Sequence, residues 1–171
     1  LRQITQAGEV TTIAGAPGVS GSADGTGSAA RFNVPAGMAA DATFIYVADG
    51  FNHTLRRVTR AGAVVTTLAG LAATPGAVDG TGSAARINLL LSVAMDSAGD
   101  LYGVEFSSHT VRKITPAGVV TTVAGLAGER GSTDGSGSTA RFFQPSAIAI
   151  GKHDTIFIAD RTNNAIRIGV K

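Results

Sequence analysis

The chain has 171 residues, and 44% of them are hydrophobic, so it has enough apolar side chains to bury the core of one domain. The 14 Lys and Arg and 12 Asp and Glu give a net charge of only +2. The sequence contains no cysteine, which excludes a disulfide framework and a cysteine-ligated zinc site. No apolar run reaches the roughly 18 residues that a membrane span requires, so we expect no membrane partner.

One sequence unit recurs three times along the chain. The motif VTTxAG stands at residues 10–15, 65–70 and 120–125, and a longer motif, DGxGxxAR followed by Phe or Ile, stands at 24–32, 79–87 and 134–142. Successive copies of both motifs lie 55 residues apart. A fixed period of this length is the signature of a repeat architecture.

Each unit predicts four short strands, because its β-branched and aromatic runs are separated by Gly, Asn and Asp turns. No stretch keeps the 3.6-residue apolar period of a helix. We therefore expect an all-β chain that forms one region over residues 1–171. In chain order it contains strands at 1–15 that complete a blade, a blade at 34–70, a blade at 89–125 and a partial blade at 144–171.

The first strand of each unit is rich in small side chains. These strands are expected at residues 37–41, 92–96 and 146–150. The blades of a β-propeller converge near its axis, where side chains must be small to fit. The pattern predicts a β-propeller of four-stranded blades.

A strand that ends in Asp, then YVAD, NHxxR and VTTxAG, resembles the NHL repeat in its long bacterial form with a DGxGxxARF insert. The resemblance implies a six-bladed ring. NHL propellers include RNA-binding, protein-binding and ligand-sensing members and a zinc-dependent lyase branch, so the resemblance is specific for fold and not for function. The third copy departs from the pattern, with Gly151 where Asp41 and Asp96 stand and Asn164 where His53 and His109 stand.

Three repeats make half of a six-bladed ring, and an open half ring exposes strand edges and apolar faces that invite association. We expect the chain itself to be the partner, in a homodimer that closes the ring. In that ring the N-terminal strand of one copy completes the C-terminal blade of the other. The alternative is that the chain, which begins at Leu1, is a segment of a longer protein whose other repeats lie elsewhere.

Two sets of acid–arginine pairs recur with the repeat, and we expect both to be structural. The first set, within the inserts, is Asp24–Arg31, Asp79–Arg86 and Asp134–Arg141. The second set, between the second and third strands, is Asp49–Arg56, Glu105–Arg112 and Asp160–Arg167. A calcium site in the insert is the alternative for the first set, but calcium needs several carboxylates and each insert offers one. A catalytic carboxylate is the alternative for the second, although a catalytic group has no reason to occur three times.

The equivalent histidines His53 and His109 raise the question of a metal site. Equivalent positions in adjacent blades are on the order of 10 Å apart, too far to share one ion. We expect these rings to cap their own turns, and we predict no metal and no cofactor. The basic residues are scattered without stacking aromatics, so no nucleic-acid partner is expected.

The predicted function is a non-catalytic scaffold that recognises a protein, peptide or glycan with the variable turns after the second strands. The candidate contacts in these turns are Phe51, Asn52, His53, Phe106, Ser108, His109, Arg161, Asn163 and Asn164. One alternative is a metal-dependent hydrolase or lyase with an axial ion, for which Asp41 and Asp96 are the available ligands. Another is a spacer segment of a longer secreted protein, and the composition is compatible with an extracellular or periplasmic location.

Overall fold

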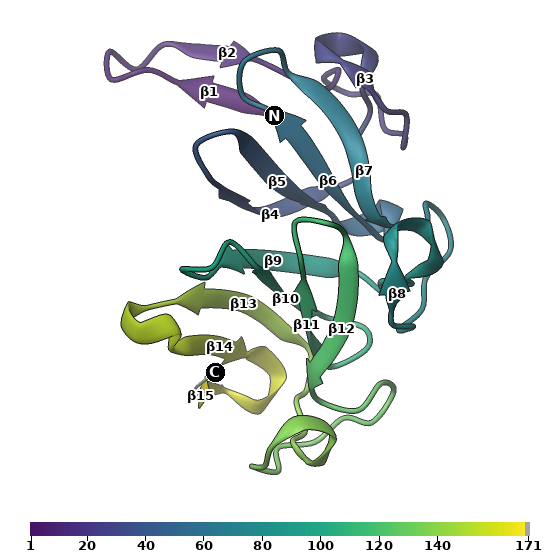
Figure 1. The fold of residues 1–171 in the computed structure, drawn as a ribbon, viewed down its shortest axis with the longest axis vertical. Helices are drawn as coiled ribbons and strands as arrows, with labels where there is room; N and C mark the ends of the chain where they lie inside the picture. Colours follow the sequence, from purple (N-terminus) through teal and green to yellow (C-terminus); the bar gives the residue numbers. More distant parts are fainter. Residues whose placement is uncertain (170–171) are drawn as a thin grey trace.

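A computed structural model of the chain describes residues 1–169 as four antiparallel β-sheets joined by loops and short 3-10 turns (Figure 1). The sheets follow one another in chain order from the top of Figure 1 to the bottom, and the two termini lie at opposite ends of this stack. No α-helix occurs between residues 1 and 169, and hence no helix there that is long and apolar enough to cross a membrane. The fold is all-β, as the sequence predicts.

The two middle sheets share one topology. The second sheet contains β4 (Pro35–Ala40), β5 (Phe44–Asp49), β6 (Thr54–Thr59) and β7 (Val64–Gly70). The third contains β9 (Leu90–Met95), β10 (Leu101–Glu105), β11 (Thr110–Ile114) and β12 (Val119–Ala124). Each sheet gains a two-residue fifth strand from the preceding insert, β3 (Gly25–Thr26) along β7 and β8 (Gly80–Thr81) along β12. The predicted four strands are therefore present and extended by one.

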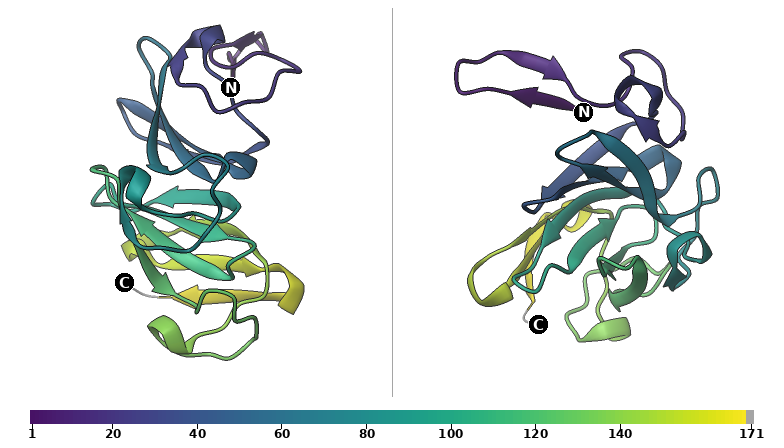
Figure 2. Two further views of the ribbon diagram at one scale, coloured as in Figure 1. Left: turned by 90° about the vertical axis from the view of Figure 1, so that its right-hand side faces the viewer. Right: turned by 45° about the horizontal axis from the view of Figure 1, so that its top comes forward.

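The first and last sheets contain fewer strands. The first is the hairpin of β1 (Arg2–Ile4) and β2 (Val10–Thr12), which correspond in sequence to third and fourth strands. The last contains β13 (Pro145–Ile150), β14 (Ile156–Asp160) and β15 (Ala165–Gly169), which correspond to first, second and third strands. Figure 2 shows the β1–β2 hairpin projecting from one end of the molecule.

Short 3-10 turns occur in the inserts, after two of the second strands and, in the last sheet, between the first and second strands. They are η1 (Gly27–Ala29), η2 (Gly50–Asn52), η3 (Gly82–Ala84), η4 (Gly137–Thr139), η5 (Lys152–Asp154) and η6 (Arg161–Asn163). The residue after η2, His53, is left-handed with a φ of 57°, and its equivalents His109 and Asn164 have φ of 62° and 53°. Histidine and asparagine are enriched in this region among non-glycine residues, which suits them to the turn.

The first strands of successive sheets lie side by side, β4 against β9 and β9 against β13. Their approach is close, because a Cβ added at Gly37 of β4 would lie 2.6 Å from the Cα of Ser92 in β9. This contact explains why the first strand of the repeat carries small residues.

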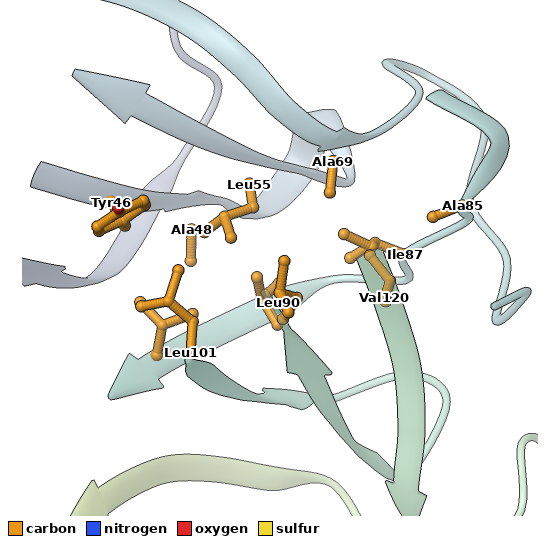
Figure 3. Packing of buried hydrophobic residues seen from close by; sticks show 11 residues of the cluster. Tyr46, Ala48, Leu55, Ala69, Ala85, Ile87, Leu90, Leu101 and Val120 are labelled. Carbon is orange, nitrogen blue, oxygen red and sulfur yellow. The ribbon is translucent and has the colours of Figure 1, made fainter. Parts of the chain in front are cut away.

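The apolar core fills the spaces between neighbouring sheets. Figure 3 shows Leu55 and Ala69 of the second sheet directed toward Leu90 and Ile87, which belong to the next repeat. A second cluster joins the third sheet to the last, and a third cluster lies beneath the first insert. Each fully buried aliphatic side chain contributes about 1.5–3 kcal/mol, so neighbouring repeats stabilise one another.

Candidate functional site

A buried arginine fastens each insert to the sheet beneath it. Arg56 of β6 is fully buried and donates hydrogen bonds to Asp49 Oδ2 at 2.8 Å and to Asp24 Oδ1 at 2.7 Å. The same guanidinium donates to the carbonyl oxygens of Arg31 at 2.9 Å and Ala23 at 3.1 Å. A buried charge requires such pairing, because an unpaired ion in the interior is strongly disfavoured.

The same arrangement surrounds the equivalent arginines of the other two units. Arg112 donates to Glu105 at 2.8 Å and to Asp79 at 3.0 Å. Arg167 donates to Asp160 at 3.0 Å and also pairs with Asp134. The second predicted set, between second and third strands, is thus present in all three units as part of a larger network.

The predicted pairs within the inserts are wrong. Arg31 donates instead to the carbonyl oxygens of Ser28 and Ala30, and Arg86 and Arg141 repeat this pattern. The carboxylates of the first set bind the arginines of the third strands. The corrected pairs are Asp24–Arg56, Asp79–Arg112 and Asp134–Arg167. The insert folds back over the third strand and so brings Asp24 to Arg56. The buried guanidinium of Arg56 requires a carboxylate partner, whereas water can solvate the guanidinium of Arg31.

Glu105 differs chemically from its equivalents, which are aspartates. It lies next to Arg112 and accepts a hydrogen bond from Thr110 Oγ1 at 3.0 Å. Burial raises the pKa of Glu105 to about 7, and the Arg112 charge opposes this rise. Ser108 replaces the asparagine of the other two turns. The longer side chain of Glu105 and the shorter side chain of Ser108 thus fill the space that aspartate and asparagine fill in the other units.

Three of the predicted contact residues lie within the turn and hold it together. Asn52 donates from Nδ2 to Asp49 Oδ2 and to the Gly21 carbonyl oxygen, both at 2.7 Å. Asn163 makes the equivalent two bonds in the third unit, and Ser108 is buried. The two asparagines therefore connect turn and insert, whereas Ser108 hydrogen-bonds Glu105 within its own turn.

The histidines bridge neighbouring sheets, which the sequence did not predict, and His109 also makes the predicted contact with its own turn through a hydrogen bond to the backbone of Phe106. The backbone N–H of Leu89 donates to His53 Nδ1 at 3.2 Å, and that of Gln144 donates to His109 Nδ1 at 3.1 Å. Burial lowers the pKa of both rings, which favours the neutral form that can accept at Nδ1. No group of three or more His, Cys, Asp or Glu able to hold a metal occurs within residues 1–169.

The two aspartates considered as axial ligands are used in their own turns. Asp41 Oδ1 accepts from the N–H groups of Thr43 at 2.6 Å and Phe44 at 2.7 Å, and these bonds lower the pKa of Asp41. Asp96 Oδ1 accepts from the N–H groups of Ala98 and Asp100, both at 2.9 Å. Both carboxylates therefore shape the turn between first and second strands.

The remaining candidates include a group of neighbouring aromatic rings and guanidinium groups, which we call the aromatic–arginine cluster. It consists of Phe106, His109, Arg130, Phe143 and Arg161. The Arg161 Cζ lies 5.9 Å from the centre of the Phe106 ring, and the Arg130 Cζ lies 5.0 Å from that of Phe143. The His109 ring meets Phe143 edge to face at 5.6 Å. Both guanidinium-bearing residues are exposed, so the cluster presents positive charge to solvent.

Sequence reasoning missed two members of this cluster. Phe143 stands where the other two units have asparagine, and Arg130 stands where they have Ser20 and Pro75. The departure of Phe143 from a repeated asparagine was a signal that could have identified it, whereas the position of Arg130 differs in every unit and gave no such signal. Outside the cluster, Phe51 and Asn164 are exposed in their turns.

No family model matches the chain. A curated relative, the Protein SUPPRESSOR OF QUENCHING 1, chloroplastic, of Arabidopsis thaliana, is 31% identical over 90 residues. That match covers 52% of this chain and 8% of the relative, so the chain spans a small part of that protein.

Solved structures resemble the chain more extensively. An auxiliary nutrient binding protein from Bacteroides ovatus is 32% identical, with a TM-score of 0.67, over 74% of this chain and 34% of its own. A protein of the same description from Bacteroides thetaiotaomicron is 29% identical, with a TM-score of 0.63, over 74% of this chain and 35% of its own. The virginiamycin B lyase of Staphylococcus aureus is 15% identical, with a TM-score of 0.56, over 99% of this chain and 47% of its own. The chain thus has a propeller-like fold and spans a third to a half of these neighbours.

Proposed function

We propose that the chain is a non-catalytic β-propeller module of the NHL type that binds a ligand. The observation that carries this proposal is its likeness, over 74% of its length, to two proteins described as auxiliary nutrient binding proteins. The site chemistry agrees with it. The repeated carboxylates are held in ion pairs or turns, where they stabilise the fold.

The aromatic–arginine cluster is the proposed contact surface, together with Phe51, which is exposed in the turn after β5. All its members except His109 occupy positions that differ between units, whereas the acid–arginine pairs that hold the turns recur in every unit. Aromatic and arginine side chains are enriched where proteins bind partners. The ligand is a protein, peptide or glycan, and two exposed guanidinium groups favour one that carries carboxylates.

Binding by the immobilised chain tests this function. The probes are acidic peptides, oligosaccharides with uronic acids, and neutral oligosaccharides. The variant Arg130→Ala/Arg161→Ala is expected to lose binding to an acidic probe. The matched control is Arg57→Ala, because Arg57 makes the same type of contact, at 4.8 Å from the Phe44 ring, outside the cluster. Equal loss in both variants contradicts the assignment of the surface, and no binding to any probe favours a spacer.

We also propose that the binding unit is a six-bladed ring formed by two copies of the chain. Three sequence units support this number, as does the lyase likeness that spans 99% of this chain and 47% of the lyase. The apolar side chains at the two ends of the stack give the association its driving force.

A further inference from the structure

The last sheet borders an open groove, which we call the fourth-strand groove. It is a cavity of about 750 Å³ beside β15, lined by Ile158, Ile166 and Ile168 on one side and by residues 134–137 of the last insert on the other. Ile166 is 68% exposed, whereas its equivalents Leu55 and Val111 are buried.

A fourth strand fills this position in both middle sheets. β7 lies between β6 and the short strand β3, and β12 lies between β11 and β8. Residues 135–136 correspond to β3 and β8, so both walls of a strand-sized slot are in place beside β15. The groove therefore has the hydrogen-bonding edges that a single antiparallel strand requires.

The groove also has polar groups placed for that strand. Asp24 Oδ1 accepts from the Thr67 hydroxyl at 3.0 Å, and Asp79 Oδ1 accepts from the Thr122 hydroxyl at 2.9 Å. The equivalent Asp134 has a side chain that is 94% exposed. The matching occupant carries a threonine at the position of Thr67 and Thr122.

The chain contains one further segment of this sequence, at residues 10–15. It reads VTTIAG and includes β2, whose Thr12 corresponds to Thr67. Within the described residues β2 pairs with β1 alone and has a second, open edge. Val10 is half exposed, whereas its equivalents Val65 and Val120 are buried. β2 thus has an edge without a partner strand, and the groove has room for a strand of the same sequence type.

We propose that β2 of a second copy occupies the fourth-strand groove, paired with β15 on one edge and with residues 135–136 on the other. This inference rests on the proposed ring and names its joint. β1 and β15 are both third strands, so β2 exchanges β1 of its own chain for β15 of the other. The exchange is favoured because β1 consists of three exposed residues and pairs, within residues 1–169, with β2 alone, whereas β15 is paired with β14.

The opposite end of the molecule fits the same arrangement. Leu89 and Gln144 donate their N–H groups to a histidine of the preceding sheet, and Val34 is the equivalent residue of the first unit. In the closed ring the preceding sheet is the last sheet of the other copy, where Asn164 stands at the histidine position. Asn164 of the partner subunit supplies the acceptor for the Val34 N–H.

Disulfide trapping tests the register, because the native chain contains no cysteine. In the second sheet Arg57 faces Thr66, so Ile168 is expected to face Thr11 of the partner subunit. The double variant Thr11→Cys/Ile168→Cys is expected to form a covalent dimer on mild oxidation, since directly opposed residues lie within disulfide reach. The matched control is Thr66→Cys/Ile168→Cys, which is expected to stay uncross-linked because Thr66 is paired within its own sheet.

A second variant tests the polar contact without oxidation. Thr12→Val removes the hydroxyl expected to meet Asp134 of the partner subunit, and it should raise the dimer dissociation constant about 30-fold, because the symmetric dimer contains this contact twice. Thr11→Val, on the adjacent position, should leave it unchanged. A dimer by light scattering that forms no disulfide and tolerates Thr12→Val overturns the strand exchange and keeps the ring. A monomer of 17.1 kDa overturns both, and ligand binding by that monomer would leave the proposed binding function standing.

Discussion

The two carboxylates that share Arg56 are expected to differ strongly in their contribution to stability. Asp49 is buried and accepts hydrogen bonds from the Asn33 N–H at 2.7 Å, from Asn52 at 2.7 Å and from Arg56 at 2.8 Å. Asp24 binds the same guanidinium with a side chain that is 51% exposed. Replacing each by asparagine removes one carboxylate from the same arginine, so the pair of variants is matched.

The structure sets the size of the two effects. Asp49→Asn removes the buried carboxylate that pairs with the Arg56 guanidinium and places a neutral amide among three hydrogen-bond donors. This lowers the free energy of unfolding by about 3–5 kcal/mol. Asp24→Asn weakens an ion pair whose carboxylate is half exposed to water, and it costs roughly 0.2–1 kcal/mol. With a urea m-value of about 2 kcal/mol/M, the unfolding midpoint falls by about 1.5–2.5 M for Asp49→Asn and by at most about 0.5 M for Asp24→Asn.

Urea unfolding followed by circular dichroism measures both midpoints. The m-values of the two variants should match that of the wild type, which shows that the change lies in stability and not in the extent of unfolding. Equal midpoints for the two variants would refute the argument that burial makes the Asp49–Arg56 pair contribute more to the free energy of unfolding than the Asp24–Arg56 pair.

Three further outcomes follow from the same structure. Burial raises the pKa of Glu105 from 4.5 to about 7, so the stability that this group contributes is present below pH 4.5 and is lost as the pH rises through 7. In urea unfolding, the wild type should therefore lose more stability between pH 5 and 8 than Glu105→Gln does. An equal loss in the two proteins contradicts this. His53→Ala should cost about 1 kcal/mol, because the Leu89 N–H loses its acceptor, whereas His53→Asn should retain most of the stability; equal losses in thermal unfolding would argue against the bridge. Gly70→Ala should destabilise more than Gly128→Ala, since both glycines have positive φ but only Gly70 would place a Cβ against the His53 carbonyl oxygen; equal midpoints would show that this clash is relieved.

The strands were predictable because the sequence states each of them three times. One apolar run such as 45–49 is ambiguous, but three copies at a fixed spacing between glycine turns leave little choice of element. The small residues of the first strands predicted the close approach that the structure shows between Gly37 and Ser92. The short strands β3 and β8 were not predicted, because a two-residue strand depends on the edge beside it and not on its own sequence.

Side-chain partners were less predictable than strands. Asp24 and Arg31 are seven residues apart and were paired on that ground, whereas the structure brings Asp24 to Arg56, which follows 32 residues later. The histidines were assigned to their own turns because they lie too far apart to share an ion; His109 does contact its turn, but both rings also reach the next repeat, which was not predicted. Contacts between repeats depend on how the sheets stack, and a single sequence carries no direct record of that stacking.

The mass of the 171-residue chain in solution, measured by light scattering, tests the central claim most directly. The account predicts one species of twice 17.1 kDa that persists on dilution to the micromolar range. A stable, monodisperse species of 17.1 kDa would show that the open groove and the exposed β2 edge are not joined by a second copy, and it would contradict the account.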